Sequence, residues 1–186
     1  MDPAARHRTQ AEGFARIDEA VDDWAAPTPV PEWTCLDVVD HLVTWPVGFF
    51  AGGGIDLPAA PAVADDPAEA WRVHTAAIQA LLDDPDRAEG TFAHPLAGTH
   101  RLADAIDRFY TTDVLMHRWD LATAGGAPHG LDPDECAAIL AGMESMEDLL
   151  RSSGQYGPAV PVADDADPVD RLAAFIGRDP AWRPPA

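Results

Sequence analysis

Residues 110–122 read Tyr110-Thr-Thr-Asp113-Val-Leu-Met-His117-Arg-Trp-Asp120-Leu-Ala122. Asp113 and His117 are four positions apart, about one turn of an α-helix, so both side chains project from the same face. Leu102, Ile106 and Phe109 precede them at helical spacing and indicate that this face points into a core. A carboxylate and an imidazole on such a face cost on the order of several kcal/mol unless they find partners. A metal ion would satisfy both groups, and the alternatives are hydrogen bonds within the core or a solvated helix face.

A third candidate ligand, His41, lies on an earlier amphipathic stretch. A lone histidine on an apolar face is commonly a satisfied core residue, and this alternative stays open for His41. Together, His41, Asp113 and His117 would supply three protein ligands and leave one position open, the pattern of a reactive metal site. Asp120 follows His117 by three residues, so it could orient a ligand histidine or make an ordinary packing hydrogen bond.

The remaining reactive side chains are expected to be structural. Cys35 stands in the first turn of an expected helix, where the dipole lowers the pKa of a thiol, but no basic partner is apparent for it. Three histidines are expected at the surface: His74, His94 and His100. Two ion pairs are expected along a helix surface, Arg101–Asp104 and Arg108–Asp107.

Apolar residues recur at three- and four-residue spacing in several stretches of the chain. Helices are expected over about 3–25, 35–50, 67–82, 99–124 and 132–152, with a short one near 168–177. Thr34 and Asp37 have the spacing of a capping box, and Pro46 should kink the second helix near its end. Residues 83–98 should be irregular, with part of 91–96 extended or in a short turn. The pattern predicts an all-α protein, an antiparallel four-helix bundle with an extra C-terminal helix and tail.

Composition limits the classes of partner. The chain has 186 residues and a formal net charge of −20, which argues against nucleic acid and anionic membranes, because both attract basic surfaces. With 47% hydrophobic residues, we expect one globular domain over residues 1–186. No apolar run reaches the roughly 18 residues of a membrane span, and no signal-peptide pattern is visible at the N-terminus. We therefore expect a cytoplasmic protein in which Cys35 and Cys136 are reduced.

Three stretches resemble a known family. The first is Ala26-Pro-Thr-Pro-Val-Pro-Glu-Trp-Thr-Cys-Leu-Asp-Val-Val-Asp-His-Leu-Val43, and the second is Asp113-Val-Leu-Met-His-Arg-Trp-Asp-Leu-Ala-Thr-Ala-Gly125. Both resemble signatures of actinobacterial proteins related to the N-terminal domain of mycothiol-dependent maleylpyruvate isomerase. Phe175-Ile-Gly-Arg-Asp-Pro-Ala-Trp182 resembles the C-terminal signature of a small stand-alone branch of that group. The wider superfamily is the DinB-like metal-binding four-helix bundles.

The resemblance implies a divalent metal, usually zinc, held by a histidine of the second helix and an acidic-x-x-x-His pair of a later helix. These positions correspond to His41, Asp113 and His117 in this sequence. In the isomerase the acidic ligand is Glu, so Asp113 is shorter by one methylene. The resemblance also implies a low-molecular-weight thiol, such as mycothiol, as a cosubstrate.

The leading hypothesis is therefore an enzyme in which metal coordination activates a small thiol for S-transfer or for cis–trans isomerisation of a small electrophile. Two alternatives stay open. One is a non-catalytic module, with or without metal, that binds a small ligand or a partner protein. The other is a metal-dependent hydrolase in which water replaces the thiol, although the sequence offers no clear general base for it.

Overall fold

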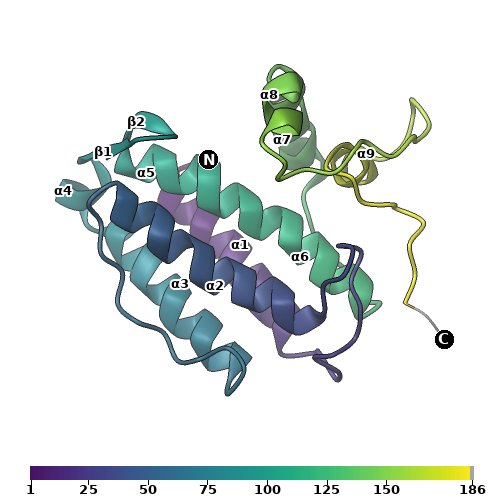
Figure 1. Ribbon diagram of the computed structural model, residues 1–186, viewed down its shortest axis with the longest axis horizontal. Coiled ribbons are helices and arrows are strands. Elements are labelled where there is room, and N and C mark those ends of the chain that lie inside the picture. The colour runs from purple at the N-terminus through teal and green to yellow at the C-terminus, as the bar shows by residue number, and fades with distance from the viewer. Residues whose placement is uncertain (185–186) are drawn as a thin grey trace.

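In the computed structural model, which describes residues 1–184, four long helices run alongside one another (Figure 1). They are α1 (Pro3–Asp18), α2 (Cys35–Gly52), α3 (Pro67–Asp83) and α6 (Thr112–Ala124). Both α1 and α2 pack against α3 and against α6, so the four helices surround a common core. Fully buried side chains from each of the four fill this core: Phe14, Leu42, Ile78 and Val114. The protein is mostly helical, as predicted.

Side-chain caps set where the helices begin. The Thr34 hydroxyl accepts a hydrogen bond from the Asp37 backbone N–H, and the Asp37 carboxylate accepts one from the Thr34 backbone N–H at 2.7 Å. This capping box confirms the prediction, and such a cap contributes about 1 kcal/mol. Asp2 and Asp66 cap α1 and α3 more simply, each side chain accepting a hydrogen bond from the backbone N–H three residues on, and each is followed by a proline in the first turn. The box also fixes the register of α2, and with it the direction in which His41 points.

The first helix ends earlier than predicted, at Asp18 rather than near residue 25. Acidic residues crowd this end of the helix, where the negative pole of its dipole disfavours them. Asp23 instead accepts a hydrogen bond from the backbone N–H of Ala25 at 2.9 Å, within the turn that follows. Local side-chain bonds of this kind compete with continuation of a helix.

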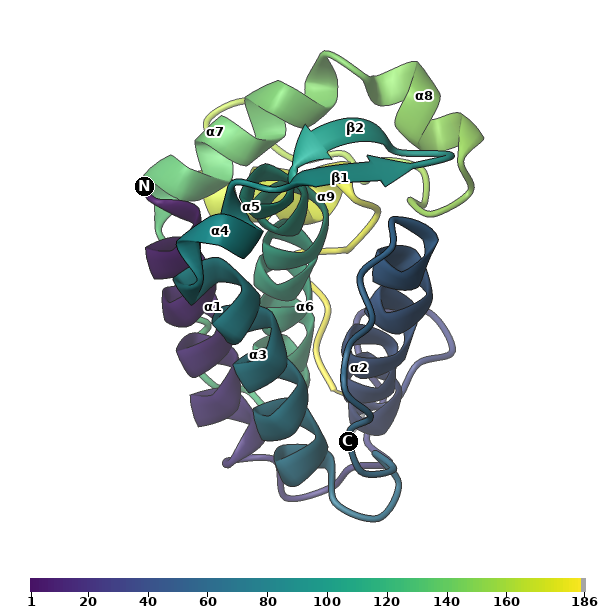
Figure 2. The same cartoon turned by 90° about the vertical axis from the view of Figure 1, so that its left-hand side faces the viewer.

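Residues 83–101 contain more regular structure than predicted. A short helix, α4 (Pro85–Ala88), precedes a β-hairpin of β1 (Thr91–His94) and β2 (Gly98–Arg101). The strands are antiparallel, with Thr91 opposite Arg101, and Gly98 adopts a φ of 86° that permits the tight connection. The predicted helix start at 99 is therefore wrong, because strand pairing takes residues 98–101. Figure 2 shows the hairpin close to α5 (Leu102–Ala105) at one end of the long helices.

The helical run that leads into α6 is not uniform. Between α5 and α6 lies a six-residue π-helical segment, η1 (Ile106–Thr111). A π-turn takes one residue more than an α-turn, and such segments are frequent near functional sites. Because of this segment, α-helical spacing does not predict which residues before η1 share a helix face with those after it. Leu102 and Ile106 are nevertheless buried, as predicted.

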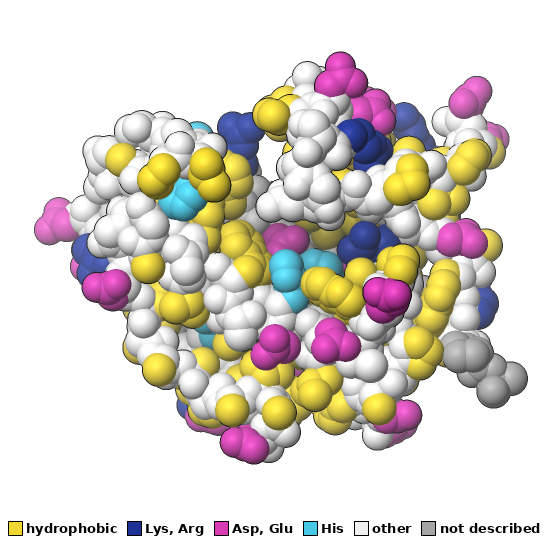
Figure 3. Space-filling model, in the orientation of Figure 1, with side chains coloured by type: hydrophobic (Ala, Val, Ile, Leu, Met, Phe, Trp, Pro, Cys, Tyr) yellow, Lys and Arg dark blue, Asp and Glu magenta, His cyan; other side chains and the backbone are white. Residues whose placement is uncertain are grey.

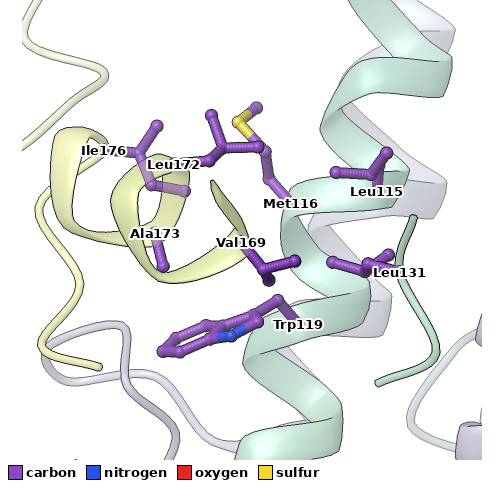
Figure 4. A pocket seen from close by; sticks show the side chains of 8 residues that line it. All are labelled: Leu115, Met116, Trp119, Leu131, Val169, Leu172, Ala173 and Ile176. Carbon is purple, nitrogen blue, oxygen red and sulfur yellow. The ribbon is translucent and has the colours of Figure 1, made fainter. Parts of the chain in front are cut away.

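Three further helices follow α6 in the chain: α7 (Pro133–Glu144), α8 (Glu147–Ser152) and α9 (Pro168–Phe175). Of these, α7 and α9 pack against each other and cover the other side of α6. The helix predicted over 132–152 is broken at Ser145–Met146, where the Ser145 hydroxyl donates to the Gly142 carbonyl oxygen. Apolar side chains of α6, α7 and α9 form a second core. Eight of its side chains line a small apolar pocket (Figure 4). Helix α6 is consequently buried on two sides.

An ionic network joins this second layer to α1. Arg6 and Gln10 of α1 both donate hydrogen bonds to the Glu135 carboxylate of α7. Arg118 of α6 donates to the Gln10 side-chain oxygen at 3.1 Å and to the Gly130 carbonyl oxygen at 3.0 Å. Arg118 therefore spans the two layers from the middle of α6. Within residues 1–184, no helix has the length and apolar character needed to cross a membrane.

Candidate metal centre

His41, Asp113 and His117 converge at the contact between α2 and α6. The Nε2 atom of His41 lies 3.0 Å from Asp113 Oδ2, and the Nε2 atom of His117 lies 3.5 Å from Asp113 Oδ1. One ligand atom from each residue lies within 4.8 Å of the other two. Zinc bonds of about 2.0–2.2 Å in a tetrahedral site keep ligand atoms roughly 3.3 Å apart, so this spacing fits a divalent metal. Across the described part of the chain, this is the one group of three such residues.

The carboxylate of Asp113 is held in its ionised form. Besides the bond to His41, its Oδ2 atom accepts a hydrogen bond from the indole N–H of Trp45 at 2.9 Å. Burial alone would raise the pKa of Asp113, but His117, His41 and Trp45 together lower it below its ordinary value. Although Asp113 is one methylene shorter than Glu, it reaches both histidines. An ionised carboxylate that lies between two imidazoles is a ligand set that suits divalent cations such as Zn²⁺.

The far side of the His117 ring is fixed by a second carboxylate. The Nδ1 atom of His117 lies 2.9 Å from Oδ2 of Asp120, which is fully buried. Arg178 donates to both Asp120 oxygens, from Nε at 3.0 Å and from Nη2 at 3.2 Å. Burial acts to raise the pKa of Asp120, but the hydrogen bond from His117 and the charge of Arg178 lower it. An ionised Asp120 accepts a hydrogen bond from Nδ1–H, so Nε2 is the ring nitrogen that lies beside Asp113 and is available to a metal.

Aromatic rings enclose the two histidines. The ring of Trp33 stacks on His117 with a centroid distance of 5.5 Å and lies 5.0 Å from His41. The ring of Trp45 lies 6.1 Å from His41 on α2. The His41 side chain keeps 30% of its surface exposed, whereas that of His117 keeps 7%. In the space-filling view, histidine side chains reach the surface near the middle of one face, beside acidic, basic and apolar groups (Figure 3). The centre is therefore lined by aromatic rings and reachable from solvent at His41.

The other predicted residues do not join this centre. His74 is wrongly predicted at the surface: it is 1% exposed, and its ring lies 5.5 Å from that of Tyr110. Burial, and to a smaller extent the charge of His7, lowers its pKa to about 4. His94 and His100 belong to the hairpin and are half-buried.

The ion-pair predictions had mixed outcomes. Arg101 pairs with Asp104 at 2.7 Å, as predicted. The predicted Arg108–Asp107 pair is wrong, because Asp107 pairs with Arg6 at 2.9 Å while the Arg108 guanidinium lies over the Phe109 ring.

Both cysteines are free and buried. Burial raises the pKa of Cys35 despite its place in the first turn of α2, and raises that of Cys136 to about 12. Neither thiol is a candidate nucleophile.

Sequence reasoning missed Trp33, Trp45 and Arg178 as parts of the centre. Trp45 had a usable signal, since it follows His41 by four residues and so shares its helix face. Trp33 immediately precedes the capping box, a position from which it can turn toward α2. Arg178 lies 58 residues from Asp120, in the segment after α9, and no local periodicity relates the two.

The fold and the centre thus define a mostly helical protein with a candidate divalent-metal site between two helices. The chain is 33% identical over 188 residues to Uncharacterized protein MT0763 of Mycobacterium tuberculosis strain CDC 1551 / Oshkosh and to Uncharacterized protein Rv0738 of strain H37Rv. Each match spans 96% of this chain and 98% of the relative. The chain belongs to the family of these mycobacterial proteins. No protein-family model and no solved structure matches it.

Proposed function

We propose that this protein is a cytoplasmic, divalent-metal-dependent enzyme that uses a low-molecular-weight thiol, such as mycothiol, for S-transfer to, or cis–trans isomerisation of, a small electrophile. In this proposal α1, α2, α3 and α6 form an antiparallel four-helix bundle of the DinB-like kind. The proposal extends the resemblance to the N-terminal domain of mycothiol-dependent maleylpyruvate isomerase. The observation that carries it is the convergence of His41, Asp113 and His117 within 4.8 Å of one another.

Each residue of the centre has a separate role in this proposal. His41, Asp113 and His117 would hold the metal through two imidazole nitrogens and a carboxylate oxygen. Three protein ligands would leave a coordination position open, and a thiol bound there would be held as its thiolate. The N–H of Trp45 keeps the Asp113 carboxylate oriented. Trp33 covers the His117 ring and so limits water on that side of the centre.

An external thiol is favoured over an internal one. Cys35 is 2% exposed and Cys136 is fully buried, and burial raises the pKa of each thiol. A thiol with a raised pKa is protonated at neutral pH and reacts slowly as a nucleophile. The partially exposed edge of the centre at His41 is where a small thiol would enter.

Metal content and thiol response test this proposal. The protein is purified with and without a chelator, its zinc content is measured, and its melting temperature is recorded with added mycothiol. We expect about one metal per chain and stabilisation by mycothiol of the metal-loaded protein only, near 2.7 kcal/mol at a thiol concentration about 100 times Kd. The oxidised disulfide of mycothiol, which has no free thiol, is the matched control.

Each other outcome points to a different function. Bound metal without a thiol response would overturn the thiol-dependent reaction and favour a metal-dependent hydrolase. Absence of both metal and a thiol response would favour a non-catalytic binding module.

A further inference from the structure

The segment that follows α9 returns to the buried side of the candidate metal centre. Helix α9 ends in a Schellman turn, in which the backbone N–H of Gly177 bonds to the Ala174 carbonyl and that of Arg178 bonds to the Ala173 carbonyl. Gly177 has a φ of 89°, and a Cβ atom there would lie 2.9 Å from the Gly157 Cα atom. Only glycine fits this turn, so the direction in which the chain leaves α9 is set by Gly177.

This turn directs Arg178 onto Asp120. The guanidinium makes two bonds to the carboxylate, at 3.0 and 3.2 Å, and a third to the Ile176 carbonyl at 3.2 Å. Asp120 has no exposed surface. A buried carboxylate is costly unless its oxygens are bonded, and Arg178 makes two of the three side-chain bonds that Asp120 has. The third bond is the one with His117.

We propose that Arg178 is a positioning residue of the metal centre, which acts through Asp120 on His117, and that docking of the segment after α9 is coupled to metal binding. This inference rests on the proposed metal site. The planar guanidinium fork holds the Asp120 carboxylate in one orientation. The carboxylate in that orientation accepts a hydrogen bond from Nδ1 of His117, which favours the tautomer that leaves Nε2, beside Asp113, available to a metal.

Loss of Arg178 has a defined local consequence. Asp120 keeps one of its three bonds and is no longer held in one orientation, so it selects the His117 tautomer less strongly. Groups that orient a ligand histidine in this way typically change metal affinity 10- to 100-fold (about 1.4–2.8 kcal/mol) when they are removed. Coupling is reciprocal, so a metal bound at His117 must in turn favour the docked form of the segment.

Three variants separate positioning from simple anchoring. Arg178→Ala removes both bonds, and Arg178→Lys keeps the charge without the fork. Arg171→Ala is the matched control, because it removes an exposed arginine from α9 itself. For each protein, ¹⁵N NMR of the imidazoles gives the share of His117 protonated at Nδ1 in metal-free protein. Titration with Co²⁺ then gives the metal affinity and the visible spectrum of the bound ion.

We expect Arg178→Ala to reduce the Nδ1-protonated share of His117 and to weaken Co²⁺ binding about 10- to 100-fold. Arg178→Lys should lie between that variant and the wild type, and Arg171→Ala should match the wild type. Amide hydrogen exchange in residues 172–178 should slow when zinc is added to the wild type.

The inference is overturned if Arg178→Ala retains wild-type tautomer populations and wild-type affinity, or if Arg171→Ala causes the same losses. Should Arg178→Ala fail to fold, Arg178→Lys gives the same comparison. If the wild type binds no metal, the proposed function fails, but the NMR measurement still decides whether Arg178 positions His117.

Discussion

Replacing His117 by alanine should abolish metal binding while leaving the fold intact. The structure explains why the two effects separate. Without the imidazole, Asp113 still accepts hydrogen bonds from His41 and Trp45, and Asp120 still accepts two from Arg178. No buried carboxylate is left without a partner, and unpartnered buried charges are what make such truncations severe.

The expected magnitudes follow from these contacts. Folding loses one charge-assisted hydrogen bond and the packing of a ring against Trp33, which together are worth about 1–3 kcal/mol. In a chain of this size that lowers the melting temperature by roughly 2–10 °C. Metal affinity should fall by at least about 100-fold, because the loss of a direct ligand exceeds the effect of removing a supporting group.

His74→Ala is the matched control. His74 is as deeply buried as His117, but it lies against Tyr110 and contributes nothing to the centre. Its replacement should cost a similar 1–3 kcal/mol, roughly, through lost packing. The melting temperatures of both variants are measured in excess chelator and in excess zinc. Zinc should stabilise the wild type and His74→Ala but not His117→Ala. Zinc stabilisation that survives in His117→Ala would refute the assignment of His117 as a ligand.

Three further predictions concern the rest of the molecule. Burial, with the charges of Glu19 and Asp66, raises the pKa of Asp18 to about 6; the folded state therefore favours the protonated acid and loses stability as the pH rises from about 4 to 6. Asp18→Asn should raise the unfolding free energy by about 1–3 kcal/mol at pH 8 and by little at pH 4, and equal effects at both pH values in denaturant titrations would contradict this. A Cβ atom on Gly13 would overlap the Arg118 guanidinium, so Gly13→Ala should lose about 1–3 kcal/mol in a thermal melt instead of gaining the roughly 1 kcal/mol usual for alanine in a helix. With a net charge of −20, the protein should not bind DNA or RNA in mobility-shift titrations at moderate salt, and a shift at micromolar protein would count against this expectation.

Local patterns predicted the parts of the molecule that local interactions determine. The Thr34–Asp37 box sets the start of α2 through contacts three residues apart. Asp113 and His117 are brought together by one turn of α6, which the four-residue spacing requires. His41 faces these two residues because α2 packs against α6.

The parts that were missed depend on contacts between distant residues or on competition between local structures. Residues 98–101 pair as a strand because β1 offers a partner, although the same residues could have begun a helix. Asp107 pairs with Arg6 across 101 residues rather than with its neighbour. Arg178 reaches Asp120 because α9 packs in the second core beside α6. Such contacts follow from tertiary packing, which helical periodicity does not describe.

The most direct test of the metal centre is X-ray anomalous scattering, measured above the zinc absorption edge, from crystals of zinc-loaded protein. The account predicts an anomalous peak about 2.0–2.2 Å from His41 Nε2, His117 Nε2 and a carboxylate oxygen of Asp113. An anomalous peak only at other residues, or none between these side chains at saturating zinc, would contradict it.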